Sequence, residues 1–340
     1  MKIVFYDEHS KLAYNPNTEK NVGVGGKETV LIKTAETLSS LLGHEVIVFT
    51  NCNIPNIYAG VKYYKYFDFR PQNEDIFISF GGCPHGYNVP KTKIYWNCFD
   101  NAQYILQNQW ADIFIVNSEW QRDIYAKVLP PDIIKKMRVV NPGVDLELLP
   151  SNEEKWEFDI SHMSHPAKGG MSVLPETFSK IKNQIPQITL HVYGGGGLWG
   201  WDNESYRGLY TKLIKSGILY HGTIAKKDLF EHLSRSKVFL YPLNNLFKES
   251  FCLSVLEAMI CGCVVVAKDS GNINTLLKDG RGFVVEGDTG HYMWSIDAAE
   301  KVIKVLNNQS LFEEMSKKSK VYARQFTWEK TATMLLRTIS

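Results

Sequence analysis

Short, strand-like apolar runs alternate with amphipathic helical segments along the whole chain, and this pattern occurs twice. Such alternation is typical of α/β folds built on mainly parallel sheets. We therefore expect an α/β fold with two Rossmann-like, doubly wound domains whose strand ends face a common cleft. The strands are predicted at residues 3–6, 44–50, 75–80, 93–96, 112–117 and 137–141, and again at 158–163, 188–193, 218–220, 238–241, 264–267 and 282–285, with a long helix over 26–42.

Length and composition agree with two domains. At about 100–200 residues per domain, 340 residues suggest two units that each bury a core. The polar, helix-breaking stretch at residues 150–155 marks the boundary between them, so we expect domains at 1–150 and 151–322 and a terminal helical segment at 323–340. The net charge of +2 argues against a nucleic-acid partner.

The chain carries no recognisable targeting signal. Met1 and Lys2 lead straight into the first apolar run, with no leader-like segment, and no apolar stretch is long enough to span a bilayer. We expect a cytoplasmic protein with at most peripheral membrane contact. The six cysteines lack paired zinc-site spacing and are expected to be reduced core residues.

Two carboxylates, Glu249 and Glu257, stand eight residues apart in the segment that contains the most information about function. Apolar residues at helical spacing predict a helix that starts just after Glu249 and places Glu257 about two turns further on. A helix N-terminus is suited to a diphosphate, because its backbone N–H groups are free, while carboxylates beside it can accept hydrogen bonds from vicinal hydroxyls. A sugar nucleotide has this layout of diol, diphosphate and diol.

This segment resembles the Glu-x7-Glu signature of retaining glycosyltransferases of family 4, in which a Leu-Glu-Ala-Met helix is followed by a valine-rich strand. Here the corresponding residues are Leu256 to Met259 and the run that begins at Val264. The resemblance covers almost the whole chain. It implies the GT-B fold, with an acceptor-side first domain, a donor-binding second domain and a C-terminal helix that crosses back to the first domain. Thr327 is the expected N-cap of that helix.

The first glycine cluster fits a phosphate-binding role. Gly25 and Gly26 open the first long helix, and in the resembled family this position wraps the donor diphosphate; a plain helix start is the competing interpretation of Lys27 and Glu28. A nicotinamide site is not expected here, because a long polar loop separates the first strand from these glycines.

Lys168 follows the first strand of the second half and precedes Gly169, where it can neutralise charge on a leaving diphosphate. The family supplies an arginine five residues earlier, but Met163 stands there. Either His165 or another cation supplies the second positive charge, or the chain manages with one.

The resemblance also implies further donor-side and acceptor-side residues. Trp199 and Trp201 either stack on a base or pack within the domain, and packing is the preferred interpretation. The family's histidine near the reacting sugar corresponds here to His85 or Asp100, although either residue is equally compatible with a surface loop. The expected catalytic residues are Glu249, Lys168, His85 and Asp100. The expected donor-binding residues are Gly25, Gly26, Lys168, His165, Gly194, Gly195, Glu249, Ser250, Phe251, Cys252, Leu253 and Glu257.

The sequence therefore predicts a retaining glycosyltransferase that moves a sugar from a nucleoside diphosphate sugar to a glycan, lipid-linked or small-molecule hydroxyl acceptor. No cofactor is expected, and no metal, because an Asp-x-Asp signature in a suitable strand context is absent from the sequence. Two alternatives remain: a non-catalytic nucleotide-sugar or glycan-binding protein of the same fold, and a nucleotide-sugar epimerase, because fold alone does not set chemistry.

Overall fold

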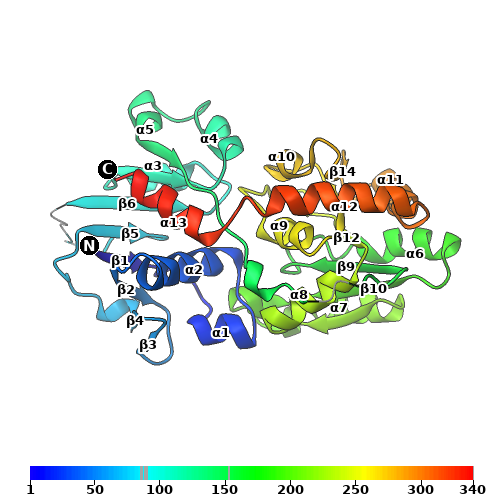
Figure 1. Cartoon of the computed structure of the whole chain (residues 1–340), viewed down its shortest axis with the longest axis horizontal. Helices are drawn as coiled ribbons and strands as arrows, with labels where there is room; N and C mark the ends of the chain where they lie inside the picture. Colours follow the sequence, from blue (N-terminus) through cyan, green and yellow to red (C-terminus); the bar gives the residue numbers. More distant parts are fainter. Residues whose placement is uncertain (85–86, 88–90, 152–153, 340) are drawn as a thin grey trace. The chain divides into compact units, whose positions relative to one another are not determined.

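The computed structural model describes residues 1–84, 87, 91–151 and 154–339. The chain forms two compact units, each built on its own sheet (Figure 1). The chain leaves the first unit after Gly143 and returns to it at Phe326, so the C-terminal segment belongs to the first unit, as the family resemblance implied. The first unit contains Met1–Glu19, Val24–Gly143 and Phe326–Ser340, and the second contains Lys20–Gly23 and Val144–Gln325.

The first unit contains an eight-stranded sheet with the order β3-β4-β2-β1-β5-β6-β7-β8. All neighbouring strands are parallel except β3 and β4, which form an antiparallel hairpin at one edge. The strands are β1 (Lys2–Tyr6), β2 (Glu45–Thr50), β3 (Asn56–Tyr58), β4 (Val61–Lys65), β5 (Ile76–Ser79), β6 (Thr92–Asn97), β7 (Ile113–Val116) and β8 (Met137–Val139).

Helices of the first unit pack on this sheet and on one another. α2 packs on β2 and β4, and α13 packs on α2, which anchors the C-terminal segment in this unit. The side chain of Thr327 accepts a hydrogen bond from the backbone N–H of Lys330, so the predicted N-cap is confirmed. The helices are α1 (Pro16–Asn21), α2 (Gly26–Ser40), α3 (Gln103–Gln107), α4 (Glu119–Tyr125), α5 (Pro131–Lys136) and α13 (Trp328–Arg337), with a 3-10 turn η1 (Tyr66–Asp68).

The second unit contains a six-stranded, fully parallel sheet with the order β11-β10-β9-β12-β13-β14. Its central strands are continuous apolar runs, such as the fully buried β13, because helices cover both faces of the sheet. The strands are β9 (Asp159–Met163), β10 (Thr189–Tyr193), β11 (Leu219–Gly222), β12 (Val238–Tyr241), β13 (Val264–Lys268) and β14 (Gly282–Val285).

Two sets of helices cover the two faces of this second sheet. The main core lies on one face, where Phe178 of α6, Leu213 of α7 and Val302 of α11 pack against Leu190 and Val238. The other face carries α8, α9 and α10. The helices are α6 (Leu174–Gln184), α7 (Arg207–Lys215), α8 (Lys226–Arg235), α9 (Leu253–Ile260), α10 (Ile273–Leu277), α11 (Tyr292–Leu306) and α12 (Gln309–Ala323), with 3-10 turns η2 (Leu146–Leu148), η3 (Gly196–Trp199) and η4 (Asn203–Tyr206).

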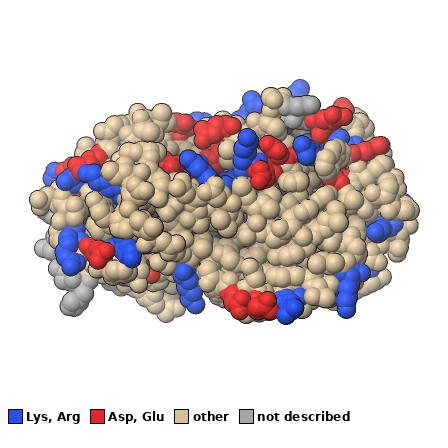
Figure 2. Space-filling view, turned by 90° about the horizontal axis from the view of Figure 1, so that it is seen from below, with Lys and Arg blue, Asp and Glu red and all other residues tan. Residues whose placement is uncertain are grey.

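Every strand expected from the sequence is present within two residues of its predicted limits, but the β3–β4 hairpin was missed. Its turn is formed by Ala59 and Gly60, which both have positive φ, the conformation that two-residue hairpin turns require. All six cysteines are free; four are buried, whereas Cys83 and Cys98 are half-buried and not core residues. On the face shown in Figure 2, positive and negative side chains of the described residues lie mixed, without a broad field of one sign.

Candidate active site

The parallel strands of the second unit bring several predicted residues to one edge of the sheet. β9 leads into the loop with His165 and Lys168, β10 leads into Gly194, and β12 leads toward Glu249. Because all six strands are parallel, their carboxyl ends lie at the same edge, which is where open α/β sheets bind ligands. The loops are also bonded to each other, since the backbone N–H of Asn244 donates to the carbonyl of Lys168 at 2.8 Å.

Lys168 and Glu249, which are 81 residues apart in sequence, form an ion pair at this edge. The Nζ of Lys168 lies 2.9 Å from the Oε2 of Glu249, and the hydroxyl of Tyr241 donates to Oε1 at 2.7 Å. Burial and the negative charge of Glu249 raise the pKa of Tyr241 well above its ordinary value, so Tyr241 stays a donor. Both oxygens of this buried carboxylate are therefore oriented, and the ammonium beside them is partly open to solvent.

Two glycines allow the loops around this pair to approach one another. Gly170 has a φ of +68°, and a Cβ there would lie 1.6 Å from the carbonyl oxygen of Pro242. Gly271 has a φ of +64°, and its Cβ would lie 2.2 Å from the carbonyl oxygen of Glu249. Any side chain at either position would push the loop of Lys168 or the segment of Glu249 out of place.

The helix that follows Glu249 begins later than predicted. α9 starts at Leu253, and Ser250 to Cys252 form a bend in which Cys252 has a φ of +78°. Glu257 is therefore the fifth residue of the helix and lies in its second turn. Among the described residues no side-chain hydrogen bond caps α9, and the backbone N–H groups at the start of a helix suit a ligand such as a diphosphate.

Glu257 is held by a cation that the sequence did not single out. The Nζ of Lys226, the first residue of α8, lies 2.9 Å from Oε1 of Glu257. The same ammonium lies 3.4 Å from Oδ2 of Asp145. The second carboxylate of the Glu-x7-Glu signature is thus paired, as the first one is.

His165 does not supply the second positive charge that the sequence left open. Burial, followed by the repulsion of the neighbouring Lys168 ammonium, lowers the pKa of His165 to about 4. The ring is stacked on Trp199 with 3.7 Å between ring centroids, and Trp201 meets its edge. His165 is therefore neutral at pH 7. Trp199 packs against His165 in this structure, in agreement with the preferred interpretation.

The glycines after β10 approach the His165 loop closely. A Cβ on Gly194, which has a φ of +106°, would lie 2.1 Å from the carbonyl oxygen of Ser164. Gly195 lies beside Asn203, whose Oδ1 would be 3.0 Å from such an atom. The structure thus brings His165, Lys168, Gly194 and Glu249 to one edge of the second sheet.

The remaining predicted residues belong to the first unit. Gly25 is the N-cap of α2 and Gly26 is its first residue, while Asp100 is exposed in the bend after β6. His85 lies outside the described residues.

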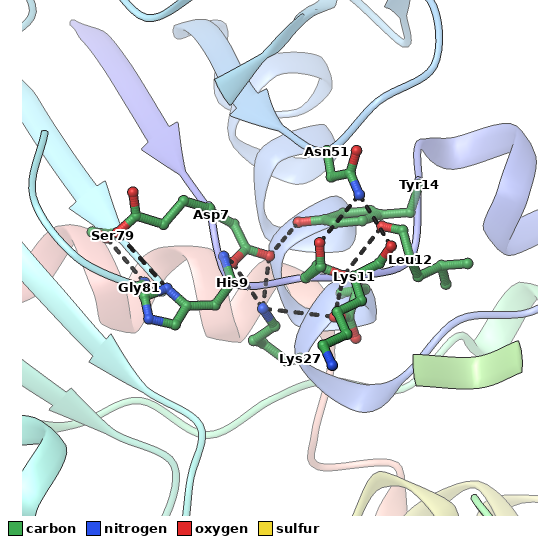
Figure 3. Close-up of polar contacts among 12 residues, drawn as sticks. Asp7, His9, Lys11, Leu12, Tyr14, Lys27, Asn51, Ser79 and Gly81 are labelled. Carbon is green, nitrogen blue, oxygen red and sulfur yellow. Dashed lines mark hydrogen bonds and ion pairs between the residues drawn. The ribbon is translucent and has the colours of Figure 1, made fainter. Parts of the chain in front are cut away.

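Lys27 belongs to a buried ionic cluster at the carboxyl end of β1 (Figure 3). Its Nζ lies 2.8 and 2.7 Å from the two carboxylate oxygens of Asp7, and the hydroxyl of Tyr14 donates to Asp7 at 2.9 Å. Burial opposes the charge on Lys27, but Glu28 and Asp7 offset it and raise the pKa of the ammonium. The side chain of Lys27 is therefore engaged by Asp7, which favours the interpretation of Lys27 as a structural residue at the start of α2.

Sequence reasoning missed Asp7, Tyr14, Tyr241 and Lys226. Only Asp7 had a usable signal, because a charged residue directly after a buried strand lies at the ligand-binding edge of a parallel sheet. The partners of the other three become visible only when distant segments are placed in space. Among the described residues, no group of three or more His, Cys, Asp or Glu side chains is arranged to hold a metal ion. Nor does that part of the chain contain a helix both long and apolar enough to cross a membrane.

Comparison with solved structures defines the class of fold. Sucrose-phosphate synthase from Thermosynechococcus elongatus superposes with a TM-score of 0.75 at 16% identity, over 99% of this chain and 98% of that one. The Anabaena protein HepE, solved in complex with UDP-glucose, gives 0.71 at 16% identity over 99% of both chains. The chain therefore has the GT-B fold of glycosyltransferases.

Sequence comparison defines the family. The model of the family "Glycosyl transferases group 1" matches residues 153–325, half of the chain, and the protein belongs to that family. The phosphatidyl-myo-inositol mannosyltransferase of Mycobacterium tuberculosis is 26% identical over 179 residues, which cover 52% of this chain and 45% of that protein. The D-inositol 3-phosphate glycosyltransferase of Paenarthrobacter aurescens is 26% identical over 216 residues, 60% of this chain and 51% of that one. The chain spans about half the length of the curated relatives it matches.

Proposed function

We propose that the protein is a retaining glycosyltransferase of family 4 that transfers a hexose-like unit from a nucleoside diphosphate sugar to a hydroxyl acceptor without a metal. The observation that carries this proposal is the Lys168–Glu249 pair at the carboxyl edge of the second sheet, 2.9 Å apart and next to the uncapped start of α9. A cation and a helix N-terminus on one side of a positioned carboxylate suit a diphosphate joined to a sugar.

In the proposed donor complex, the diphosphate lies against the first N–H groups of α9 and the Lys168 ammonium. Lys168 has three donor hydrogens, so it can contact a phosphate oxygen while it keeps its bond to Glu249. Glu249, fixed by Tyr241, accepts hydrogen bonds from the donor sugar, and Glu257 accepts them from the ribose hydroxyls. His165, Gly194 and Gly195 shape the same side of the donor site.

In the proposed reaction, negative charge develops on the departing diphosphate. As the glycosidic bond breaks, the electron pair of that bond goes to the diphosphate, and Lys168 and the α9 dipole stabilise the added charge. The acceptor hydroxyl attacks from the same face, its oxygen bonds to the anomeric carbon, and its proton passes to the departing diphosphate. The linkage is therefore formed with retention. Asp100 or His85 remains the predicted catalytic residue near the reacting sugar.

The comparisons support a nucleotide-sugar donor in general terms. HepE was solved with UDP-glucose, and both curated relatives are named as transferases of sugars. The proposed acceptor is a hydroxyl of a glycan, a lipid-linked molecule or a small molecule. The cytoplasmic location expected from the sequence stays a prediction.

One observation favours a second candidate, a nucleotide-sugar-binding protein without transferase activity. β9 ends at the buried Met163, where the resembled family has an arginine, and the neutral His165 does not replace that cation. Lys168 is thus the one cation assigned to the leaving diphosphate in the proposed donor complex. Transfer then depends on Lys168 and the helix dipole together.

The function is tested by a ligand panel followed by a turnover assay. Thermal unfolding is measured with UDP, GDP and ADP and with their common sugar conjugates, and a ligand at about 100 times its Kd stabilises the fold by about 2.7 kcal/mol. The conjugate that binds is then incubated with mono- and oligosaccharide acceptors, and release of the diphosphate is followed. Binding with neither transfer nor hydrolysis supports the second candidate. A panel without any stabilising nucleotide contradicts both.

A further inference from the structure

Lys226 links two buried carboxylates of the second unit. It is the first residue of α8, and its ammonium lies 2.9 Å from Oε1 of Glu257 in α9 and 3.4 Å from Oδ2 of Asp145, which directly precedes η2. The side chains are 11%, 10% and 2% exposed, respectively. Three segments distant in sequence therefore meet at one nearly dry ionic contact.

This cation is not explained by the stability of α8. A positive side chain in the first turn of a helix faces the positive end of the helix dipole, so Lys226 is unfavourable for α8 itself. Two buried carboxylates, Glu257 and Asp145, lie within ion-pair distance of its charge. Removing Lys226 takes a cation away from two buried anions, and buried charges are costly when they lose a partner.

We propose that Lys226 is a positioning residue for the ribose of the donor: its ion pair fixes the direction of the Glu257 carboxylate, so that this carboxylate accepts hydrogen bonds from the ribose 2′- and 3′-hydroxyls. The inference rests on the proposed function, because Glu257 is the ribose-binding residue there. A carboxylate has about four lone-pair sites, and Lys226 occupies one of them on Oε1. Asp145 is a second carboxylate partner of the same ammonium, with Oδ2 at 3.4 Å from Nζ.

The ribose diol provides a test that separates positioning from general stability. If Lys226 acts through Glu257 on the diol, its removal should matter for a nucleotide with a 2′-hydroxyl and hardly at all for its 2′-deoxy counterpart. A purely structural role would weaken both ligands to the same degree. The informative quantity is therefore the ratio of two dissociation constants, not either constant alone.

The experiment uses whichever of UDP, GDP and ADP binds most tightly, together with its 2′-deoxy analogue. Dissociation constants are measured by calorimetry for the natural protein and for Lys226→Ala, Lys226→Arg and Lys227→Ala. Lys227 is the adjacent, exposed lysine of the same helix and serves as the matched control. We expect the natural protein and Lys227→Ala to prefer the ribose form about tenfold, the scale of one hydrogen bond to a charged group. Lys226→Ala should reduce this preference to about one, and Lys226→Arg should restore most of it.

Several results would overturn the inference. A Lys226→Ala protein that keeps the tenfold ratio, whatever its absolute affinity, shows that Lys226 does not act on the diol. If the natural protein binds the diphosphate but shows no preference for the ribose form over the 2′-deoxy form, then Glu257 does not bind the ribose and Lys226 does not act through it. Nucleotide binding itself would still be supported. A natural protein that binds none of the three diphosphates refutes the proposed function as well. If Lys226→Ala does not fold, Lys226→Gln, which keeps the side-chain length without the charge, is judged by the same ratio.

Discussion

Replacing Lys168 by alanine removes the ammonium that lies 2.9 Å from Glu249 and should affect both stability and turnover. Breaking a fully buried ion pair costs about 3–5 kcal/mol, because the remaining charge is left without its partner. The Glu249 side chain is only 6% exposed, but that of Lys168 is 27% exposed, so water can replace part of the lost interaction. Tyr241 also continues to donate to Glu249. We therefore expect a loss of about 1–3 kcal/mol in the free energy of unfolding.

Turnover should fall much further than stability or donor affinity. The charge that Lys168 faces grows as the diphosphate departs, so its removal should reduce the rate about a hundredfold or more at saturating donor. Urea unfolding at pH 7.5 measures the first effect and diphosphate release measures the second. The control is Lys318→Ala, which breaks an exposed pair with Glu314 on α12 and should change stability by less than about 0.5 kcal/mol.

A double variant tests whether the stability effect comes from the pair itself. In Lys168→Ala/Glu249→Gln the buried charge is gone, and the glutamine oxygen can still accept from Tyr241. The double variant should therefore be more stable than Lys168→Ala alone. The reasoning is wrong if Lys168→Ala is as stable as Lys318→Ala and transfers sugar at the parental rate.

Three further outcomes are expected. Glu257→Gln should weaken nucleotide binding roughly tenfold or more with little change in the fold, because an amide is a poorer acceptor for ribose hydroxyls; unchanged affinity for UDP, GDP and ADP would remove Glu257 from the site. Turnover should survive saturating EDTA, since Lys168 and α9 stabilise the diphosphate; loss of activity that manganese or magnesium restores would contradict this. Burial lowers the pKa of His162 to about 4. In the unfolded state His162 is therefore protonated below about pH 6.5, whereas in the folded state it is protonated only below about pH 4. His162 should therefore remove roughly 3 kcal/mol of stability between pH 7 and pH 4, and an equal pH dependence in His162→Gln would refute this assignment.

The fold could be predicted largely because its strands are continuous buried apolar runs. A segment such as Val264, Val265 and Val266 has few alternatives to a central parallel strand, so its limits could be read closely from the sequence. The β3–β4 hairpin was missed for the opposite reason. It lies at a sheet edge, its outer strand is mostly exposed, and the turn at Ala59 and Gly60 does not stand out from a polar loop.

The site could be predicted in part. Sequence motifs identify single residues, but they do not show which distant residues contact them in the fold. Lys168 was assigned to the leaving diphosphate and Glu249 to the donor sugar, and the structure adds that these two residues form an ion pair. Lys226 gave no signal, since a lysine at the start of an amphipathic helix is usually solvated. The charge state of His165 was also beyond the sequence, because it depends on burial against Trp199 and on the nearby Lys168.

We propose that the Lys168–Glu249 edge of the second unit transfers a sugar with retention of its anomeric configuration. Proton NMR of the anomeric signal, recorded during the first turnovers with the nucleoside diphosphate sugar that binds, tests this proposal. An α-linked donor should give an α-linked product, or an α-anomer on slow hydrolysis before mutarotation, and Lys168→Ala should form it about a hundredfold more slowly. A β-configured first product from an α-linked donor, or no release of the diphosphate from any donor that binds, would contradict retaining transfer at this edge.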